Sequence, residues 1–149
     1  MNYRIVCVSL AAAALTVSSL AVAEHSPQHE RHELMEDVGK AAKVVGKMLR
    51  EEAEYDAAAA MQSLETFKSV SSKFGDLFPV GSETGEGTEA APAIWEDRQG
   101  FDAALQDWAE AVDAAMAAAP ATLDEAKPVL GAVFKTCKGC HDSYRIEDE

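Results

Sequence analysis

Two cysteines and a histidine near the C-terminal end of the sequence, in Cys137-Lys138-Gly139-Cys140-His141, stand at a spacing that brings their side chains together. On a helix, residues three and four positions apart lie on one face. Both thiols and the imidazole would therefore point toward one partner. Cys-x-x-Cys-His is the attachment signature of c-type haem, in which the thiols form thioethers with the porphyrin vinyl groups and the histidine reaches the iron. We predict one covalently attached haem c, with His141 as an iron ligand.

The first 23 residues have the three-part layout of a secretory signal. Met1–Arg4 carries one positive charge, Ile5–Leu15 is a nearly unbroken apolar run, and Ala21–Ala23 is a small-x-small cleavage box. A membrane anchor needs about 20 apolar residues, and Thr16 and the serines that follow it break this run too early. We expect cleavage after Ala23 and, in a bacterium, export to the oxidising periplasm. Haem is attached to c-type proteins after such translocation.

Three other interpretations of the cysteine motif are weaker. Cys7 leaves with the signal, so a zinc site, which needs four ligands, would lack a second Cys/His pair. A thioredoxin-like redox pair belongs in a β-α-β context, and strand patterns are almost absent here. A disulfide between Cys137 and Cys140 would close a loop too small to stabilise the fold. The motif therefore favours haem.

The composition describes a single acidic globular domain. The 149 residues include 13 Lys and Arg against 26 Asp and Glu, for a formal charge of −13, and 48% of them are hydrophobic. This excess excludes binding to nucleic acid, whose phosphates need basic side chains, and to an anionic membrane surface. It favours a soluble protein whose partner has a basic surface and is attracted at long range.

Residues 24–149 are predicted to form an all-α domain, an antiparallel four-helix bundle with the haem attached to its C-terminal helix. Apolar residues recur every three or four positions, and strand signals are almost absent. The expected helices run from Pro27, after Ser26 as N-cap, past Leu49; from about Asp56 to Phe74; from about Pro92 to Ala119; and from the Thr122 region to near Ile146.

The connections between these helices predict how they pair. Short links, at residues 52–55 and around Pro120, make each consecutive pair antiparallel. Between the pairs, Gly75–Ala91 is a long loop rich in Gly, Pro and acid, and such a loop usually wraps something or serves a function. In the last helix, Thr122 and Glu125 have the spacing of a capping box, whereas Pro128 predicts either a kink or a helix start near Lys127.

The position of the motif, on the last helix of a bundle, resembles the class II cytochromes c, the cytochrome c′ family. The resemblance covers essentially all of residues 24–149 and implies a single haem c inside a four-helix bundle, with His141 as the proximal ligand. The segments that carry it are Thr136–Arg145, similar to the family's C-terminal signature; Arg31–Gly39, similar to its first-helix motif; and Leu77–Pro79, Gly81-Ser82, Ala93–Trp95 and Phe101, similar to its middle segments.

The resemblance also assigns roles to residues outside the motif. Arg31 falls where the family has an arginine that contacts a haem propionate, and Met35 occupies the position facing the iron opposite His141. Where the family usually has glutamine, this chain has His32, which lies one turn from Met35 and is a second candidate for the sixth ligand. Arg145, one turn after His141, would shield the proximal face or contact a propionate, or simply complement the helix dipole.

The predicted function depends on Met35. If its thioether binds the iron, the haem is six-coordinate and low-spin, and Met/His ligation raises the reduction potential of an electron carrier. If Met35 only packs over the iron, the haem is five-coordinate and binds nitric oxide or carbon monoxide. Both variants occur in the family. The Leu34-Met35 pair resembles the low-spin members, so the sequence favours the electron carrier.

An electron carrier with this surface is expected to exchange electrons with redox proteins that dock through basic surfaces. No constellation of acid, base and nucleophile indicates an enzyme. The sequence is compatible with a monomer or a homodimer.

Overall fold

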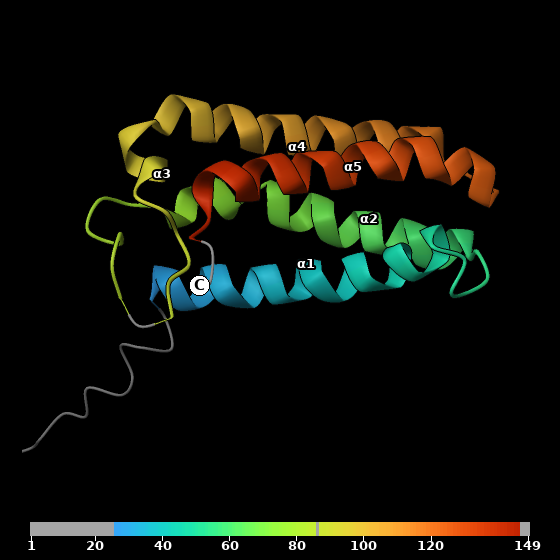
Figure 1. The fold of residues 1–149 in the computed structure, drawn as a ribbon, viewed down its shortest axis with the longest axis horizontal. Coiled ribbons are helices and arrows are strands. Elements are labelled where there is room, and N and C mark those ends of the chain that lie inside the picture. The colour runs from blue at the N-terminus through green and yellow to red at the C-terminus, as the bar shows by residue number, and fades with distance from the viewer. Residues whose placement is uncertain (1–25, 86, 147–149) are drawn as a thin grey trace, which may run out of the picture.

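In the computed structural model, which describes residues 26–85 and 87–146, the chain is a bundle of four long helices (Figure 1). Neighbouring helices along the chain run in opposite directions, so the predicted antiparallel four-helix bundle is confirmed. The predicted signal, residues 1–23, lies outside the described residues. The elements are α1 (Pro27–Leu49), α2 (Ala57–Ser71), the 3₁₀ turn η2 (Phe74–Leu77), α3 (Ala93–Glu96), α4 (Arg98–Ala118) and α5 (Leu123–Tyr144).

Side-chain caps fix where the helices begin. Ser26 Oγ accepts the amide of His29 at 3.2 Å, ahead of a proline at the first position of α1, as the sequence predicts. The Asp56 carboxylate accepts the amides of Ala58 and Ala59 at 2.9 and 3.0 Å at the start of α2. Each cap satisfies backbone N–H groups that a helix N-terminus leaves without an intrahelical partner.

The predicted capping box of α5 is confirmed, because the Thr122 hydroxyl accepts the Glu125 amide and the Glu125 carboxylate accepts the Thr122 amide. The helix therefore begins at Leu123, and a start near Lys127 is wrong. Pro128 lies inside α5, where it removes one helical hydrogen bond. The two reciprocal bonds of the cap hold the first turn in spite of that loss.

The prediction of one continuous helix over residues 92–119 is wrong, because the chain breaks at Asp97 into α3 and α4. The backbone there leaves the helical region, with φ of −124° and ψ of 62°, and the Asp97 carboxylate accepts the Gly100 amide at 3.1 Å. An aspartate that caps a following helix in this way competes with continuation of the preceding one. Similarly, α2 ends at Ser71, and η2 begins only at Phe74.

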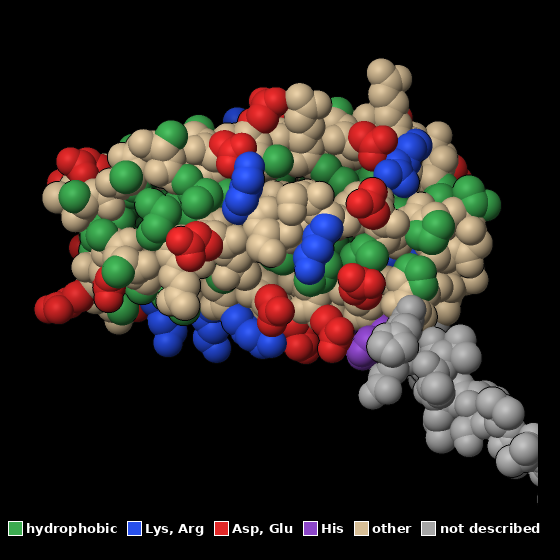
Figure 2. Space-filling view, turned by 180° about the vertical axis from the view of Figure 1, so that it is seen from behind, with side chains coloured by type: hydrophobic (Ala, Val, Ile, Leu, Met, Phe, Trp, Pro, Cys, Tyr) green, Lys and Arg blue, Asp and Glu red, His purple; other side chains and the backbone are tan. Residues whose placement is uncertain are grey.

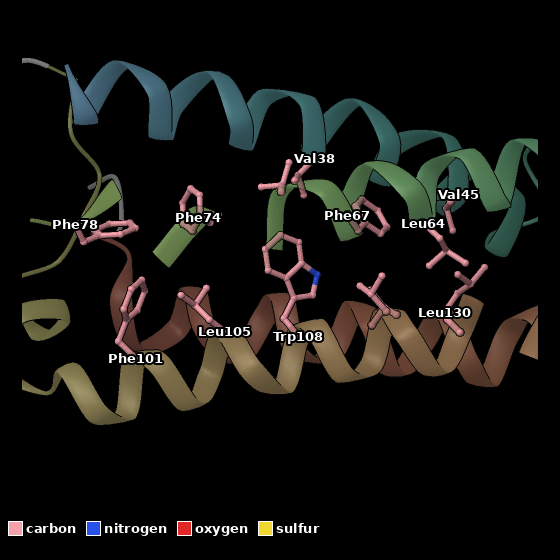
Figure 3. Packing of buried hydrophobic residues seen from close by; sticks show 14 of the residues in the cluster. Val38, Val45, Leu64, Phe67, Phe74, Phe78, Phe101, Leu105, Trp108 and Leu130 are labelled. Atoms are coloured by element: carbon pink, nitrogen blue, oxygen red, sulfur yellow. The ribbon is translucent and has the colours of Figure 1, made fainter. Parts of the chain in front are cut away.

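The hydrophobic core changes in character along the bundle. Figure 3 shows phenylalanine rings at the end where α1 begins, Trp108 near the middle, and mostly aliphatic side chains, with Phe67 among them, toward the other end. At the aliphatic end Val45, Leu64 and Val112 have no exposed surface, which is the close packing expected of a protein interior. The aromatic end is where the predicted site residues lie.

The long loop between η2 and α3 ties the beginning of α1 to the end of α5 (Figure 1). At one side the Ser82 carbonyl accepts a hydrogen bond of 2.7 Å from Arg31 Nη2. At the other, Ala90 and Arg145 form an antiparallel bridge, with Ala91 N–H donating to the Tyr144 carbonyl and Ile146 N–H to the Glu89 carbonyl. These two attachments hold the loop across one end of the bundle.

Charge is segregated along α1, which forms the lower edge of Figure 2. The first half of the helix carries four exposed acids and the second half carries exposed lysines, so the end of the bundle with the aromatic core and the loop is the acidic end of α1. The acids are Glu30, Glu33, Glu36 and Asp37, and the lysines are Lys40, Lys43 and Lys47. Among the described residues, no helix has the length and apolar character needed to cross a membrane.

Replacing Gly100 by alanine is predicted to destabilise the protein. A Cβ at this position would collide with the Asp97 carboxylate that caps α4 and with the Tyr144 hydroxyl, so we expect the free energy of unfolding to fall by about 1–3 kcal/mol. The control is Gly131→Ala, in α5, where a Cβ meets nothing within 4 Å and better helix propensity adds up to about 1 kcal/mol. Urea unfolding followed by circular dichroism measures both, and equal midpoints for the two variants would contradict the prediction.

Candidate haem site

A cavity of about 460 Å³ lies at the aromatic end of the bundle, bounded by α1, α4, α5 and the long loop. Pockets that hold small ligands and cofactors have volumes of about 300–1,000 Å³. All the residues predicted from the sequence to bind the cofactor line this one cavity, although they come from opposite ends of the chain. They are Arg31, Met35, Cys137, Cys140, His141 and Arg145.

One wall of the cavity is the last turns of α5, which present both cysteines and His141, as the helical spacing predicts. Cys137 and Cys140 are free thiols that pack against the hydrophobic core. Burial raises the pKa of the Cys137 thiol and, aided by the charge of Cys137, raises that of Cys140 to about 11. Redox-active Cys-x-x-Cys pairs show the opposite shift, a lowered pKa, so this geometry does not support a thioredoxin-like pair.

His141 stands beside these thiols at the end of α5. Burial lowers the pKa of its imidazole, and the nearby positive charge of Arg145 lowers it further. Both effects favour the neutral form of histidine, which is the form that binds a metal.

The α1 wall carries the two candidates for the second axial position. Met35 is partly buried and packs against the hydrophobic core. His32 also borders the cavity, but its side chain is exposed and its Nε2 lies 3.6 Å from Glu36 Oε1. The structure therefore places the thioether deeper in the wall than the imidazole.

Arg31 is the most unusual side chain of the site, because a guanidinium is buried there without a carboxylate bonded to it. Only 6% of the residue is exposed, and burial lowers its pKa. Its Nε and Nη2 donate to the carbonyls of Pro27 and Ser82, and its charge lies 4.5 Å from the centroid of the Phe78 ring. Nη1 is buried with no partner. A buried donor of this kind is costly unless something accepts from it.

The donors and the space of the cavity fit a haem. Two thiols and an imidazole share one helix face, and a buried cation keeps the N–H groups of its Nη1 free to donate to an anionic group such as a propionate. A bare metal ion does not fit: within residues 26–85 and 87–146, no group of three or more His, Cys, Asp or Glu side chains is arranged to hold one.

The remaining walls include residues whose place the sequence did not predict. Arg145 Nε lies 2.6 Å from Glu89 Oε2, a carboxylate 56 positions earlier that also lines the cavity. Trp108 belongs to the hydrophobic core and also borders the cavity, with 5% of its surface exposed and a buried Nε1 that has no partner. No local pattern signals either contact, because both depend on how distant segments pack.

Two aromatic residues from the segments that resemble the family, Phe101 and Trp95, differ in their relation to the cavity. Phe101 lines the cavity and stacks edge-to-face on Phe78 and Tyr144. Trp95 contacts the outer side of Phe78 and donates from Nε1 to the Pro79 carbonyl at 3.3 Å, and it is not among the lining residues.

The model of the cytochrome c′ family matches residues 26–145. The chain belongs to this family. Cytochrome c′ of Rhodopseudomonas palustris is 38% identical over 132 residues, which cover 87% of this chain and 88% of that protein. Cytochrome c-556 of Agrobacterium fabrum is 35% identical, over 79% of this chain and 80% of that protein. A solved structure of cytochrome c′ from Rhodopseudomonas palustris superposes with a TM-score of 0.80 and 34% identity, covering 83% of this chain and 98% of that one.

Membership of the cytochrome c′ family confirms the predicted cofactor. Its proteins carry one covalently attached haem c, and Cys137 and Cys140 are present near the C-terminus to hold it. Membership does not assign the second axial ligand of the iron.

We infer that Arg31 neutralises a haem propionate, so Arg31→Gln should lower the reduction potential. Oxidised haem carries one more positive charge than reduced haem, and a nearby cation therefore destabilises the oxidised form. Its loss should shift the potential down by on the order of 50 mV. Arg50→Gln is the matched control, because Arg50 is exposed at the far end of α1 and pairs with Glu52. Potentiometric titration measures both, and an unchanged potential in Arg31→Gln would show that its charge does not reach the haem.

Proposed function

We propose that the protein is a periplasmic electron carrier whose haem iron is bound by His141 from α5 and by Met35 from α1. The observation that supports this assignment most strongly is the placement of Met35. Its side chain is partly buried in the α1 wall of the same cavity that His141 borders from α5. A thioether and an imidazole on different walls provide the two axial ligands of a cytochrome that transfers electrons.

The haem supplies one redox centre that alternates between ferric and ferrous iron, and the side chains of this chain set its properties. Cys137 and Cys140 fix the porphyrin to α5 through thioether bonds. His141 and Met35 would hold the iron, and a haem held by two protein side chains would exchange an electron with little rearrangement. Burial by the aromatic walls and methionine ligation both raise the reduction potential.

The cellular location and the absence of catalysis belong to the same proposal. A signal that ends at Ala23 would deliver the chain to the compartment where haem is attached. The groups that line the cavity then have binding roles, since the two thiols form thioethers and the imidazole holds iron. A carrier needs no general acid, base or nucleophile.

The alternative is a five-coordinate haem that binds nitric oxide or carbon monoxide. It is supported by the packing of Met35 against the hydrophobic core. Methionine is flexible and fills gaps well, so a side chain that stays in the core leaves one face of the iron open. The two proposals differ only in where the Met35 sulfur lies.

Met35→Leu tests the axial ligand, because leucine keeps most of the volume and removes the sulfur. The ferrous wild-type protein is expected to show sharp, separate α and β absorption bands and to take up carbon monoxide poorly. The variant should show broad bands and bind carbon monoxide readily. Absorption spectra with and without the gas measure both properties.

Met116→Leu is the control, since Met116 packs against the core from α4 and does not line the cavity. It should keep the wild-type spectrum. Broad bands and ready binding of carbon monoxide in the wild-type protein itself would reject Met35 as ligand and favour the gas-binding alternative.

A further inference from the structure

A tight turn over Pro79–Ser82 presents an apolar side chain at its tip. Ser82 N–H donates to the Pro79 carbonyl at 3.2 Å, and Gly81 has a φ of +93°, as expected of glycine at the third position of a type II turn. Val80 occupies the second position and is 92% exposed, whereas the other large exposed hydrophobic residues of the described chain reach at most 46%.

The turn is held so firmly that Val80 is fixed in its outward position. The Pro79 carbonyl also accepts from the Ser82 hydroxyl at 2.8 Å and from Trp95 Nε1 at 3.3 Å. The Ser82 carbonyl accepts from buried Arg31. These bonds attach the turn to α3 on one side and to α1 on the other, so the tip is preformed for contact.

Acidic side chains accompany this apolar tip. Asp76 precedes it on η2, Glu83 follows it directly, and Glu96 lies on α3 beside Trp95. One base, Arg98, also lies beside this segment: its Nη1 and Nη2 donate to the carbonyls of Phe78 and Gly75, and its charge is paired with Asp102 at 2.8 Å. The first half of α1, which the turn contacts, is acidic as well (Figure 2). An apolar centre with an acidic rim complements a surface that has a basic rim.

The tip is also close to the cofactor site along the chain. Phe78, which immediately precedes the turn, lines the cavity, and so does Arg31, which binds the turn. The turn that carries Val80 is therefore joined to the cavity wall through Phe78 and Arg31.

We propose that the Val80 tip, defined as Pro79–Gly81 with Asp76, Glu83 and Glu96 around it, is the surface on which a redox protein docks. The partner is a protein whose own redox centre is encircled by lysines or arginines around a small apolar patch. This inference rests on the proposed function as an electron carrier, and it adds where electrons enter or leave.

A matched pair of substitutions tests the tip. Val80→Lys and Val44→Lys add the same charge at exposed valines, and Val44, 43% exposed, lies about 20 Å farther along α1 than Arg31. The probe is a lysine-rich mitochondrial-type cytochrome c, oxidised and mixed with the reduced holoprotein by stopped flow at low ionic strength. Val80→Lys should slow the second-order rate about tenfold, and Val44→Lys less than twofold.

A second pair tests the acidic rim. Glu96→Gln beside the tip should slow transfer about twofold and flatten its dependence on ionic strength, whereas Glu54→Gln, in the link between α1 and α2 at the opposite end of the bundle, should change neither. Reduction potentials and spectra of all four variants should match the wild type, which excludes an altered haem.

Equal slowing by Val80→Lys and Val44→Lys would show that only net charge matters and would overturn the docking surface. A wild-type protein that transfers no electron to the probe, or that has an open, gas-binding haem, would instead overturn the proposed function. The two failures are therefore distinguishable.

Discussion

The buried charge of Arg31 connects the parts of this molecule that matter for function. A guanidinium with 6% exposure must be surrounded by acceptors or by an opposite charge. Here two carbonyls and the face of Phe78 accommodate most of it, and Nη1 remains without a partner beside the cavity. The residue thus fixes the loop to α1 and, in the role we infer for it, would neutralise an anionic propionate of the cofactor.

The position of Arg31 explains why the loop can be long without being loose. Its bond to Ser82 holds one side of the loop, and the bridge between Ala90 and Arg145 holds the other. Arg145 adds an ion pair to Glu89, but both side chains are about half exposed, and such surface pairs contribute little to stability. The backbone bonds therefore do most of the holding, and the ion pair sets where the guanidinium lies beside His141.

Interactions between residues close together in the sequence were predictable, and they include the Cys-x-x-Cys-His motif at the centre of the site. Cys137, Cys140 and His141 share a face because helical periodicity requires it, and the Thr122–Glu125 capping box follows from its spacing alone. The break at Asp97 was not predicted. In a segment whose apolar residues recur at helical spacing, an aspartate is equally compatible with an exposed position inside a helix and with the N-cap of a new one. In the folded chain the Tyr144 hydroxyl of α5 donates to the same carboxylate at 3.3 Å, a contact between distant segments that the sequence does not indicate.

Contacts between distant segments were not predictable from one sequence. Arg31 and Met35 could be placed in the site only through a family resemblance, because no pattern within the first helix indicates which other helix it packs against. The partner of Arg145 and the unpaired indole of Trp108 had no local signal, and the glycine at position 81 is compatible with a tight turn but does not show that the turn is bonded to α1 and α3. Each depends on the three-dimensional course of the loop, which carries no periodic pattern.

The arrangement of the bundle separates stability from function along its length. The aliphatic end is closely packed and joined by short links. The aromatic end holds the cavity, the buried cation, the loop and the acidic half of α1 (Figures 1 and 3). Attachment of haem through the last turns of α5 puts the redox centre at that same end. Under the proposed role as an electron carrier, a partner attracted by this negative charge would meet the molecule at the end that holds the redox centre.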